Sequence, residues 1–377
     1  MTAGRLRVGV IGANPDVGWA AATHLPVLAE LPDFELTAVA TRRAESAEAA
    51  AARWGARHAF TDLDELIAHP DVDVVTVSIQ LPARDDLVTR VIDAGKHVYC
   101  EWPLAINGAE AARLRDLADA KGVRHIVGLQ NRHHPAVRLA RELVAAGEIG
   151  EVLSATFSYS AARSHLPGDR LPRRMIWLVD RERGANDLTI LSAHALDLFG
   201  TVVGGFRELS ALLSIRTPRM VVDETGEELA VTSPDQILIH GELDSGAVAA
   251  VQIMIGTPAG AGARMDILGR TGRLTLQTTT ANLIGGEFVA ALARAGRPPT
   301  ILEIPERHRG PLPAASVAAG NVAVNYVLLA EAIRTGAPLS PDFTTATRLH
   351  RLVDTIAEAA STGRRTPVTL SASPPAP

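Results

Sequence analysis

The alternation of apolar strand-like runs with helix-forming stretches over the first 130 residues constrains the fold of this chain most strongly. The strand-like runs lie at 5–11, 35–40, 72–79, 97–100 and 125–129. Short continuous apolar runs are typical of strands that are buried on both faces. Their alternation with helices indicates a parallel sheet with helices on both sides. We therefore predict an α/β domain over residues 1–130.

The chain changes character after about Gly150, where strand-like runs follow one another with few helices between them. These runs lie at 152–159, 209–216, 236–243, 247–255, 264–268 and 273–277. Glycine-containing turns separate several of them, which favours antiparallel pairing in a large open sheet. We predict a second α/β domain over residues 131–370, followed by a disordered tail at 371–377.

Several local features complete this outline. A helix is expected at 19–31, with Pro26 inside it, and another at 343–361 that packs back on the first domain. The polar segment 217–233 and the proline-rich segment 294–320 are expected to be long loops. Loops of this length in a compact domain are usually functional or mobile.

Charge and composition exclude several classes of protein. The chain has 37 Lys and Arg residues and 42 Asp and Glu residues, a net charge of −5 that argues against a nucleic-acid or anionic-membrane partner. Cys100 is the single cysteine, so neither an intrachain disulfide nor a cysteine-based zinc site can form. Apolar runs fall short of the roughly 18–20 residues that a membrane span requires, and no signal-peptide pattern is found. We expect a cytoplasmic protein.

A glycine-rich turn follows the first strand-like run. Its sequence is Gly12-Ala13-Asn14-Pro15-Asp16-Val17-Gly18-Trp19. At the first strand–helix junction of a parallel sheet, such a turn directs backbone N–H groups at a phosphate. We assign Gly12, Asn14, Gly18 and Trp19 to a bound dinucleotide. The fingerprint is imperfect, because Asn14 stands at the middle glycine position and the turn has one extra residue.

The end of the second strand distinguishes NAD from NADP. An acidic residue there binds the ribose 2′-hydroxyl of NAD, whereas arginine accommodates the 2′-phosphate of NADP. The residues are Thr41, Arg42 and Arg43, without a carboxylate. Thr41 can donate to a phosphate oxygen and either arginine can cover it, so we predict NADP as the preferred cofactor and NAD as the alternative. A solvated basic turn is the competing interpretation.

Further motifs connect the chain with a known family. The segments are Gly95-Lys96-His97-Val98, Gln130-Asn131-Arg132, Gly147-Glu148-Ile149-Gly150, Gly269-Arg270-Thr271-Gly272 and Ala332-Ile333-Arg334-Thr335-Gly336. With the Gly12 turn, they resemble the glucose–fructose oxidoreductase / inositol dehydrogenase / MocA family of NAD(P)-dependent oxidoreductases over nearly the whole chain. The resemblance implies a Rossmann dinucleotide-binding domain and a C-terminal α/β domain with a large open, mostly antiparallel sheet. It also implies a lysine beside the nicotinamide and a proton-transferring histidine.

The chain departs from both catalytic motifs of that family. Trp102 stands where the family has its lysine, and Ile190 stands four residues before His194, where the family has an aspartate. Lys96 and Lys121 are the only lysines, and each precedes a strand. Both would lie at the edge of the sheet opposite the cofactor, so neither replaces the missing lysine.

The candidate site residues follow from these positions. His194 is assigned as catalytic acid/base, with Asp197 one helical turn later as its hydrogen-bonding partner; a structural histidine is the competing interpretation. Trp102 is assigned as an apolar wall over the nicotinamide or a sugar, with a core aromatic as the alternative. Further substrate-binding residues are Asn186, Arg163 and Trp177, and further cofactor-binding residues are Gln80, Glu101, Gln130 and Asn131. No metal site is predicted.

Two of these assignments carry a specific expectation. Glu101, as an exposed carboxylate at a strand end, suits a ribose hydroxyl. Arg163 begins an arginine-rich segment that would suit an anionic substrate or form a solvated loop face. The segment contains Arg163, Arg170, Arg173, Arg174, Arg181 and Arg183. The amides of Asn186, Gln130 and Asn131 either bind sugar or cofactor hydroxyls or cap loop backbone.

The sequence therefore predicts an NAD(P)-dependent oxidoreductase, with NADP preferred, that acts on a sugar, sugar derivative or similar polyhydroxylated small molecule. Segments 19–26, 101–105 and 184–190 resemble a subgroup around the yeast galactose-regulon repressor and its bacterial oxidoreductase-like relatives. Two alternatives thus stay open: a non-catalytic dinucleotide-binding sensor, and an enzyme that uses transient redox for elimination or epimerisation. A homodimer or homotetramer through the open sheet is expected.

Overall fold

The computed structural model describes residues 4–81, 84, 86–164, 166, 168–257, 259–313 and 316–369. It divides into two compact units: unit 1 comprises Met1–Gln130 and Gly310–Thr347, and unit 2 comprises Asn131–Arg309 and Arg348–Pro377. Residues 310–347 group with unit 1, whereas the sequence assigned them to the second domain. The tail expected at 371–377 lies outside the described residues.

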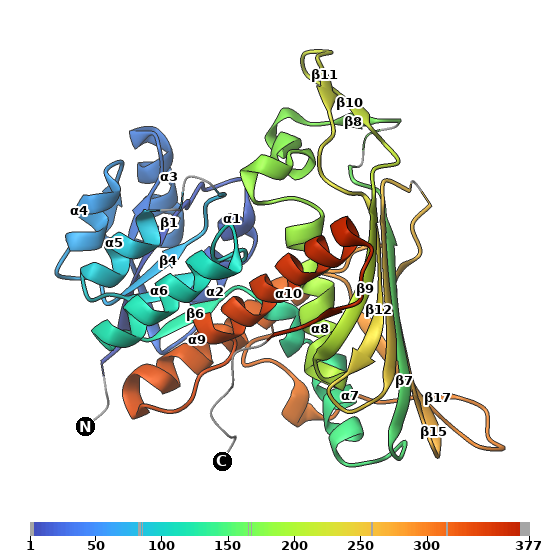
Figure 1. The fold of residues 1–377 in the computed structure, drawn as a ribbon. Helices are drawn as coiled ribbons and strands as arrows, with labels where there is room; N and C mark the ends of the chain where they lie inside the picture. Colours follow the sequence, from blue (N-terminus) through green and yellow to red (C-terminus); the bar gives the residue numbers. More distant parts are fainter. Residues whose placement is uncertain are drawn as a thin grey trace. The chain divides into compact units, whose positions relative to one another are not determined.

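Unit 1 contains a six-stranded parallel sheet in the order β3-β2-β1-β4-β5-β6 (Figure 1). Its strands are β1 (Leu6–Ile11), β2 (Phe34–Ala40), β3 (His58–Phe60), β4 (Val74–Val77), β5 (His97–Cys100) and β6 (His125–Val127). The order reverses between β1 and β4, the point where doubly wound sheets bind ligands at the carboxyl ends of their strands. The predicted Rossmann-type fold is confirmed.

Helices cover both faces of this sheet. They are α1 (Trp19–Ala22), α2 (His24–Glu30), α3 (Ala44–Trp54), α4 (Leu63–Ala68), α5 (Leu87–Asp93), α6 (Gly108–Lys121) and α9 (Val317–Thr335). The prediction of a single helix at 19–31 is wrong, because the helix is interrupted at Thr23, between α1 and α2. Among the residues that the structure describes, no helix is long and apolar enough to cross a lipid bilayer.

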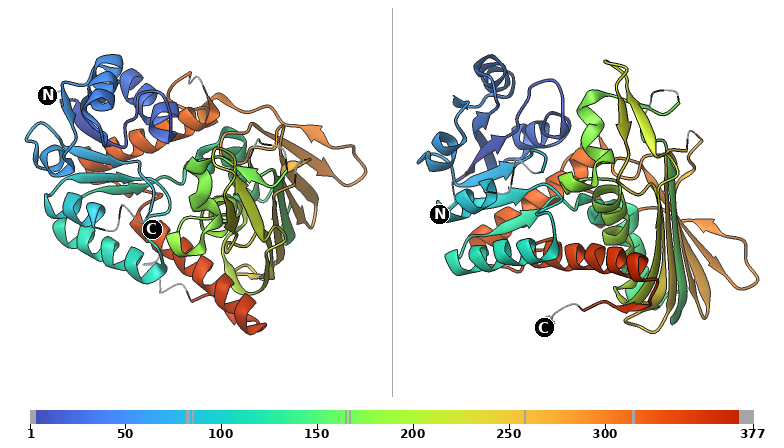
Figure 2. Two further views of the ribbon diagram at one scale, coloured as in Figure 1. Left: turned by 90° about the horizontal axis from the view of Figure 1, so that it is seen from above. Right: turned by 45° about the horizontal axis from the view of Figure 1, so that its top comes forward.

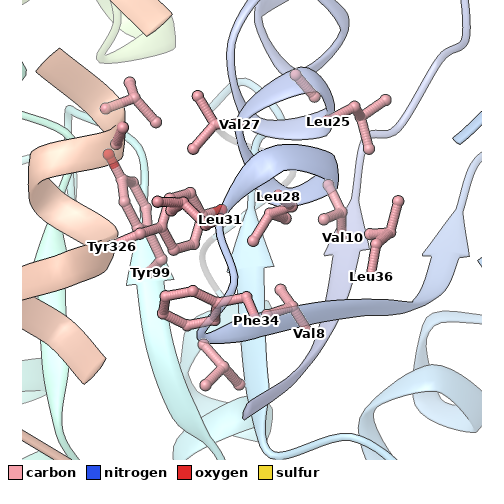
Figure 3. Packing of buried hydrophobic residues seen from close by; sticks show 14 of the residues in the cluster. Val8, Val10, Leu25, Val27, Leu28, Leu31, Phe34, Leu36, Tyr99 and Tyr326 are labelled. Carbon is pink, nitrogen blue, oxygen red and sulfur yellow. The ribbon is translucent and has the colours of Figure 1, made fainter. Parts of the chain in front are cut away.

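One hydrophobic core explains why α9 belongs to unit 1. Val8 and Val10 of β1 and Leu28 of α2 pack in one cluster with Tyr326 and Leu329 of α9 (Figure 3). All five side chains are at most 1% exposed. Because β-strand side chains alternate, residue 9 of β1 faces the other side of the sheet, where a glycine leaves room for α4.

Unit 2 contains a nine-stranded sheet in the order β17-β16-β15-β14-β7-β13-β12-β9-β18. The strands are β7 (Val152–Ala161), β9 (Phe206–Ser214), β12 (Gln236–Leu243), β13 (Val248–Ile255), β14 (Gly262–Gly269), β15 (Gly272–Thr278), β16 (Phe288–Arg294), β17 (Thr300–Ile301) and β18 (Thr366–Pro367). β7 and β13 pair in parallel, and the other neighbours pair antiparallel. The predicted open, mostly antiparallel sheet is confirmed.

Helices α7 (Pro135–Ala145) and α8 (Ala193–Val203) lie on the same face of this sheet (Figure 2). Buried side chains alternate with exposed or half-buried ones along β13, as expected for a sheet with one covered face. Helix α10 (Phe343–Thr362) is divided between the units: its residues through Thr347 belong to unit 1 and the rest belong to unit 2. Its expected packing on the first domain stays a prediction.

The two segments expected as long loops contain regular structure. Within 217–233, strands β10 (Arg219–Val222) and β11 (Glu228–Ala230) form a hairpin, and β10 also pairs with β8 (Arg170–Leu171). Segment 294–320 contains β17, the 3-10 helix η5 (Glu306–His308) and the first residues of α9. Further short helices are η1 (Gln130–His133), η2 (Arg173–Val179), η3 (Arg181–Arg183) and the π-helical η4 (Leu188–Ser192).

Candidate functional site

The glycine turn lies directly after β1 at the reversal point of the unit 1 sheet. Gly12 has φ +90°, and a Cβ there would collide with the carbonyl oxygen of Ser78 after β4. Gly18, just before α1, has φ +99° and open space around its Cα. Both glycines are therefore required by the backbone itself, since L side chains rarely adopt such φ values. The turn is therefore closely packed at Gly12 and has free space at Gly18.

Two other turn residues serve the protein itself. The Oδ1 of Asn14 accepts hydrogen bonds from the backbone N–H of Asp16 (3.0 Å) and Val17 (3.1 Å), so it shapes the loop from within. Trp19 is half-buried against the apolar core of unit 1. The assignment of Asn14 to the cofactor thus rests on its backbone N–H group. The assignment of Trp19 rests on the exposed part of its indole.

The end of β2 presents two free cations. Thr41 Oγ1 donates to the carbonyl oxygen of Arg43 at 2.9 Å, so the hydroxyl that was expected to donate to a phosphate already has an acceptor. Arg42 and Arg43 are exposed. Within the described part of the chain, no ion pair involves either guanidinium group. The two arginines therefore remain as the donors for an anion at this strand end.

Glu101, which follows β5, is 9% exposed, so the expectation of an exposed carboxylate is wrong. Its Oε1 lies 2.9 Å from Nε2 of His24, which is completely buried in α2. A Cβ on Gly128, after β6, would collide with the Glu101 carboxylate. Nδ1 of His24 lies 2.9 Å from the hydroxyl of Tyr326. The carboxylate is therefore held between β6 and a buried histidine.

Sequence reasoning missed His24 and Tyr326 as partners of Glu101. His24 lies 77 residues from Glu101 and 302 from Tyr326, so no local pattern links them. The available signal was a histidine on the apolar face of a helix, which needs hydrogen-bond partners when buried. Arg84 was also missed; it is 4% exposed and donates to the carbonyl oxygens of Glu101 and Pro103.

Three more predicted cofactor residues lie at the carboxyl ends of unit 1 strands. Trp102, next to Glu101, is 5% exposed, and Gln80 after β4 is exposed. Gln130 is 1% exposed, and its Oε1 has no hydrogen-bond partner among the described residues. A buried polar atom without a partner costs free energy, which a ligand donor would recover. Together with the open space at Gly18, this atom fits a dinucleotide at this edge.

The predicted catalytic pair lies in unit 2. His194 is 4% exposed and Asp197 is 7% exposed, both on α8. Both carboxylate oxygens of Asp197 accept hydrogen bonds from the guanidinium of Arg132. The hydrogen bond from Nε to Oδ2 is 3.1 Å long. Sequence reasoning did not find this bidentate ion pair. The π-helical turn η4 directly precedes α8, and π-helical turns are frequent at functional sites.

Two predicted amides in unit 2 have structural partners. The Oδ1 of Asn186 accepts from the backbone N–H of Leu188 (3.0 Å) and Thr189 (3.2 Å), so it caps the start of η4. Asn131 donates from Nδ2 to the carbonyl oxygen of Leu283 at 3.3 Å. The capping interpretation therefore describes both of these contacts.

Arg163 is buried against two aspartates. Its Nε donates to Oδ2 of Asp187 at 2.9 Å, and Nη2 lies 3.7 Å from Oδ2 of Asp235. Burial raises the pKa of Asp187 to about 6, although Arg163 opposes the shift. Arg163 also lines a cavity of about 370 Å³ with Ser164.

Two other members of the arginine-rich segment pair with nearby aspartates, and Arg170 also lines the cavity beside Arg163. Arg170 pairs with Asp223 at 2.8 Å and Arg183 pairs with Asp180 at 3.1 Å. Trp177 is half-buried and donates from its indole N–H to the carbonyl oxygen of Arg174 at 2.8 Å. These contacts favour the interpretation of a solvated loop face over that of an anion site.

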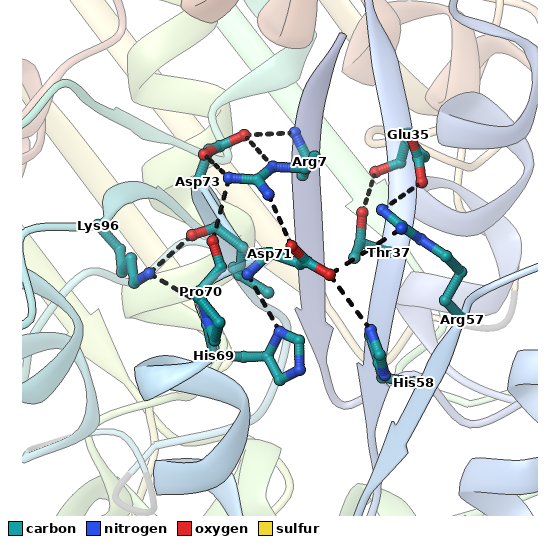
Figure 4. Close-up of polar contacts among 11 residues, drawn as sticks. Arg7, Glu35, Thr37, Arg57, His58, His69, Pro70, Asp71, Asp73 and Lys96 are labelled. Atoms are coloured by element: carbon teal, nitrogen blue, oxygen red, sulfur yellow. Dashed lines mark hydrogen bonds and ion pairs between the residues drawn. The ribbon is translucent and has the colours of Figure 1, made fainter.

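A polar network occupies the opposite, amino-terminal edge of the unit 1 strands (Figure 4). Arg7 contacts Asp71 at 2.9 Å and Asp73 at 2.8 Å, and it lowers the pKa of Asp73 through a side-chain hydrogen bond. Lys96 donates to the carbonyl oxygens of His69 (3.0 Å) and Val72 (2.8 Å). This lysine therefore serves the edge away from the glycine turn.

The same network contains one group of metal-ligand type within the described residues, formed by His58, His69 and Asp71. Asp71 Oδ1 already accepts from Arg7, and the Nδ1 of His69 accepts from the backbone N–H of Asp71 at 3.1 Å. Arg57 lies 3.9 Å from the other oxygen of Asp71. Two arginines on one carboxylate disfavour a cation there, so no metal is assigned.

The fold and the site together define a protein of the dinucleotide-binding α/β class, with a Rossmann sheet in one unit and a broad mixed sheet in the other. A family model described as "Oxidoreductase family, NAD-binding Rossmann fold" matches residues 6–129. A model described as "Gal80p, C-terminal domain" matches residues 135–278. The chain belongs to the glucose–fructose oxidoreductase / inositol dehydrogenase / MocA family, which confirms the resemblance found in its sequence.

Relatives of this chain include both dehydrogenases and regulators. Dehydrogenase aclE of Aspergillus oryzae is 32% identical over 63% of this chain and 67% of its own length. The regulatory protein GAL80 of Kluyveromyces lactis is 26% identical over 64% of this chain and 56% of its own. Levoglucosan dehydrogenase of Pseudarthrobacter phenanthrenivorans is 29% identical over 59% and 57%. The last two matches thus span less than two thirds of the relative.

Solved structures cover almost the whole chain. Levoglucosan dehydrogenase in complex with NADH and L-sorbose has a TM-score of 0.83 at 25% identity, covering 98% of this chain and 100% of that one. A super-repressor mutant of Gal80p from Saccharomyces cerevisiae has a TM-score of 0.86 at 21% identity, with the same coverage. The second likeness is one of fold.

Proposed function

We propose that this chain is an NADP-preferring oxidoreductase that acts on a sugar, a sugar derivative or a similar polyhydroxylated small molecule. The observation that carries the proposal is the constellation at the carboxyl edge of the unit 1 sheet. Gly12, Glu101 and the unpartnered Oε1 of Gln130 follow three strands of a Rossmann sheet. The dehydrogenase relatives support a redox role, and the complex of levoglucosan dehydrogenase with NADH and L-sorbose supports a sugar-like substrate.

The cofactor would be held by residues of unit 1. Backbone N–H groups of the turn from Gly12 to Gly18 would contact the pyrophosphate, and Arg42 with Arg43 would contact the 2′-phosphate. Glu101 would accept hydrogen bonds from ribose hydroxyls, and Trp102 would form an apolar wall. When bound, the nicotinamide supplies the hydride acceptor or donor of the reaction.

His194 would take or give the hydroxyl proton of the substrate at an imidazole nitrogen. Histidine suits this role because its ordinary pKa lies near neutral pH. The bidentate pair between Arg132 and Asp197 would fix the helix face on which His194 stands. The cavity beside Arg163 and Ser164 offers polar groups for further substrate hydroxyls.

A second candidate function is a dinucleotide-binding regulator without turnover. The specific observations that favour it are Trp102 at the position of the family lysine and the match of residues 135–278 to the Gal80p C-terminal domain. A third candidate keeps the cofactor bound and uses transient oxidation for elimination or epimerisation. All three require the same dinucleotide site, so turnover is what separates them.

A single-turnover assay tests the proposal. Stoichiometric protein is mixed with NADP⁺ and pooled sugars, sugar alcohols and glycosides, and the absorbance of reduced nicotinamide is followed. We expect reduction by the wild-type protein, none by His194→Asn, and unchanged reduction by Arg113→Ala, which alters an exposed residue of α6. Tight NADP⁺ binding without any reduction would favour the regulator or the internal redox cycle. Full activity of His194→Asn would move the acid/base role to another residue.

A further inference from the structure

A buried chain of hydrogen bonds runs from the carboxyl end of β5 into the core of unit 1. Glu101 Oε1 lies 2.9 Å from His24 Nε2, and His24 Nδ1 lies 2.9 Å from the Tyr326 hydroxyl. That hydroxyl lies 2.8 Å from Thr76 Oγ1. His24, Tyr326 and Thr76 are completely buried, so the chain ends inside the protein.

One direction of the hydrogen bonds in this chain makes Glu101 the final acceptor. Burial raises the pKa of Tyr326 far above its ordinary value, so its hydroxyl stays protonated. It can donate to His24 Nδ1 while accepting from Thr76, which leaves the proton of the neutral imidazole on Nε2. Nε2 then donates to Glu101. The carboxylate of Glu101 is thus the acceptor at this end of the chain.

Two aromatic rings pack against the imidazole of His24. The ring of Tyr99 in β5 meets it edge-on, with centroids 4.8 Å apart, and the hydroxyl of Tyr99 accepts from Asn325 Nδ2 at 2.9 Å. Tyr326 also meets it edge-on at 5.7 Å. Helix α9, which carries Asn325 and Tyr326, thereby determines how the histidine of α2 points at Glu101.

We propose that His24 is a positioning residue: it holds the carboxylate of Glu101 against Gly128 as a preorganised acceptor for hydroxyl groups of the dinucleotide. The proposal rests on the proposed function, because it requires that Glu101 contacts the cofactor. The inner end of the chain, at Thr76, is completely buried, so the chain meets the cofactor edge only at Glu101. Positioning through charge-assisted hydrogen bonding is therefore the role that this geometry supports.

Two substitutions of similar size separate positioning from packing. The amide nitrogen of glutamine reaches about as far as Nε2 of histidine, so His24→Gln keeps the donor to Glu101 and loses the contact with Tyr326. The amide of asparagine reaches only as far as Nδ1, so His24→Asn keeps the contact with Tyr326 and loses the donor. If His24 served packing alone, both variants would bind the dinucleotide equally well.

The test is a fluorescence titration of wild-type protein and variants with NADPH and with NADH, accompanied by thermal unfolding. We expect His24→Gln to bind within roughly threefold of wild type and His24→Asn to bind at least about tenfold more weakly, the order of one charge-assisted hydrogen bond. Equal affinities of the two variants would overturn the proposal, whether or not both are less stable than wild type.

A second variant reaches Glu101 without touching His24. Gly128→Ala introduces a Cβ where the carboxylate lies, so it should weaken dinucleotide binding as His24→Asn does. Gly200→Ala is the matched control, because Gly200 lies in α8 with open space around it and should leave binding unchanged. Wild-type affinity in Gly128→Ala would overturn the proposal.

A measurement without cofactor distinguishes this proposal from the proposed function. In ¹⁵N-histidine NMR spectra of the free protein, His24 should carry a slowly exchanging proton on Nε2, and Glu101→Gln should perturb its signal. A proton found on Nδ1 alone would overturn the positioning of Glu101 by His24. Absence of any dinucleotide binding by wild type, with the Nε2 proton present, would instead refute the proposed function and leave the His24–Glu101 pair as a structural one.

Discussion

At the scale of single residues, cofactor preference depends on which donors remain free at the end of β2. Thr41 uses its hydroxyl to bind the carbonyl oxygen of Arg43, and the side chains of Arg42 and Arg43 extend into solvent. An exposed guanidinium gains little binding free energy from an uncharged hydrogen-bond partner. It binds a phosphate more strongly, because two parallel hydrogen bonds join two charged groups. The 2′-phosphate of NADP supplies such a group, whereas the ribose hydroxyl of NAD does not.

The substitution Arg42→Ala tests this difference. It should weaken NADPH binding about 10- to 100-fold, because a hydrogen bond to a charged group contributes about 1.5–3 kcal/mol, while NADH binding should change little. Arg113→Ala, which removes an exposed arginine from α6, is the matched control and should change neither affinity. Equal weakening for both cofactors would assign Arg42 to the common part of the dinucleotide, and the NADP preference would be wrong.

At the scale of elements, the buried strands could be predicted because burial on both faces requires nearly continuous apolar runs such as Val98–Cys100 of β5. The β10–β11 hairpin could not, because its strands are short and belong to a polar segment with no clear alternation. The break at Thr23 between α1 and α2 was also missed, although Pro26 is a local signal for it. Proline has no N–H to bond the carbonyl four residues earlier and its ring clashes with that carbonyl, so it is tolerated only in the first turn of α2.

The predicted site divides in the same way. Gly12 and Gly18 could be found from sequence because their φ values demand glycine at a fixed spacing. The partners of Glu101 could not, since they come from α2 and α9 and meet only after the core has formed. The bidentate contact of Arg132 with Asp197 spans 65 residues and is likewise a product of tertiary packing.

The start of α10 illustrates an element that is stabilised by a distant side chain. The backbone N–H of Phe343 donates to Nδ1 of His125 in β6 at 3.1 Å, and the two rings stack with centroids 4.4 Å apart. The first N–H groups of a helix have no partner within the helix, so His125 satisfies one of them. Burial lowers the pKa of His125, so the native state keeps the imidazole neutral.

This contact predicts a pH-dependent stability. The unfolded chain binds a proton at His125 more readily than the native one, so the contribution is fully present above about pH 6.5 and is lost as pH falls towards the lowered native pKa. His125→Asn keeps an acceptor near Nδ1 but cannot be protonated, whereas His125→Ala loses the acceptor and should cost about 1–2 kcal/mol at neutral pH. Denaturant unfolding at pH 7.5 and pH 5.5 measures both effects.

On acidification, the free energy of unfolding of wild type should fall relative to that of His125→Asn. The difference in free energy of unfolding between wild type and His125→Ala should become smaller. Because other buried histidines titrate in both proteins, the comparison uses the difference between variants at each pH. If the difference in free energy of unfolding between wild type and His125→Asn stays constant across this range, the pKa of His125 does not change on folding. The contact would then contribute to stability independently of pH.

At the scale of the whole molecule, one face of the unit 2 sheet carries exposed apolar side chains that the dinucleotide site does not explain. Leu212 and Leu238 are register neighbours on β9 and β12 and are 62% and 38% exposed. Val248 on β13 and Leu268 on β14 are 60% and 43% exposed, and both pair with Ser154 of β7. Apolar side chains gathered on a flat face are typical of an interface between subunits.

We therefore expect a homodimer or homotetramer that associates through this face, as its sequence indicates. In a closed symmetric interface, each substitution is present on both subunits. An introduced arginine would therefore be buried against its own copy or against apolar surface, which would cost several kcal/mol of association free energy. The double substitution of Leu238→Arg and Val248→Arg should reduce the mass measured by light scattering to that of one chain. Ile106→Arg, at a residue of unit 1 that is 46% exposed, is the control and should leave the mass unchanged. A single-chain mass for wild type, or an unchanged oligomer in the double variant, would exclude this face as the interface.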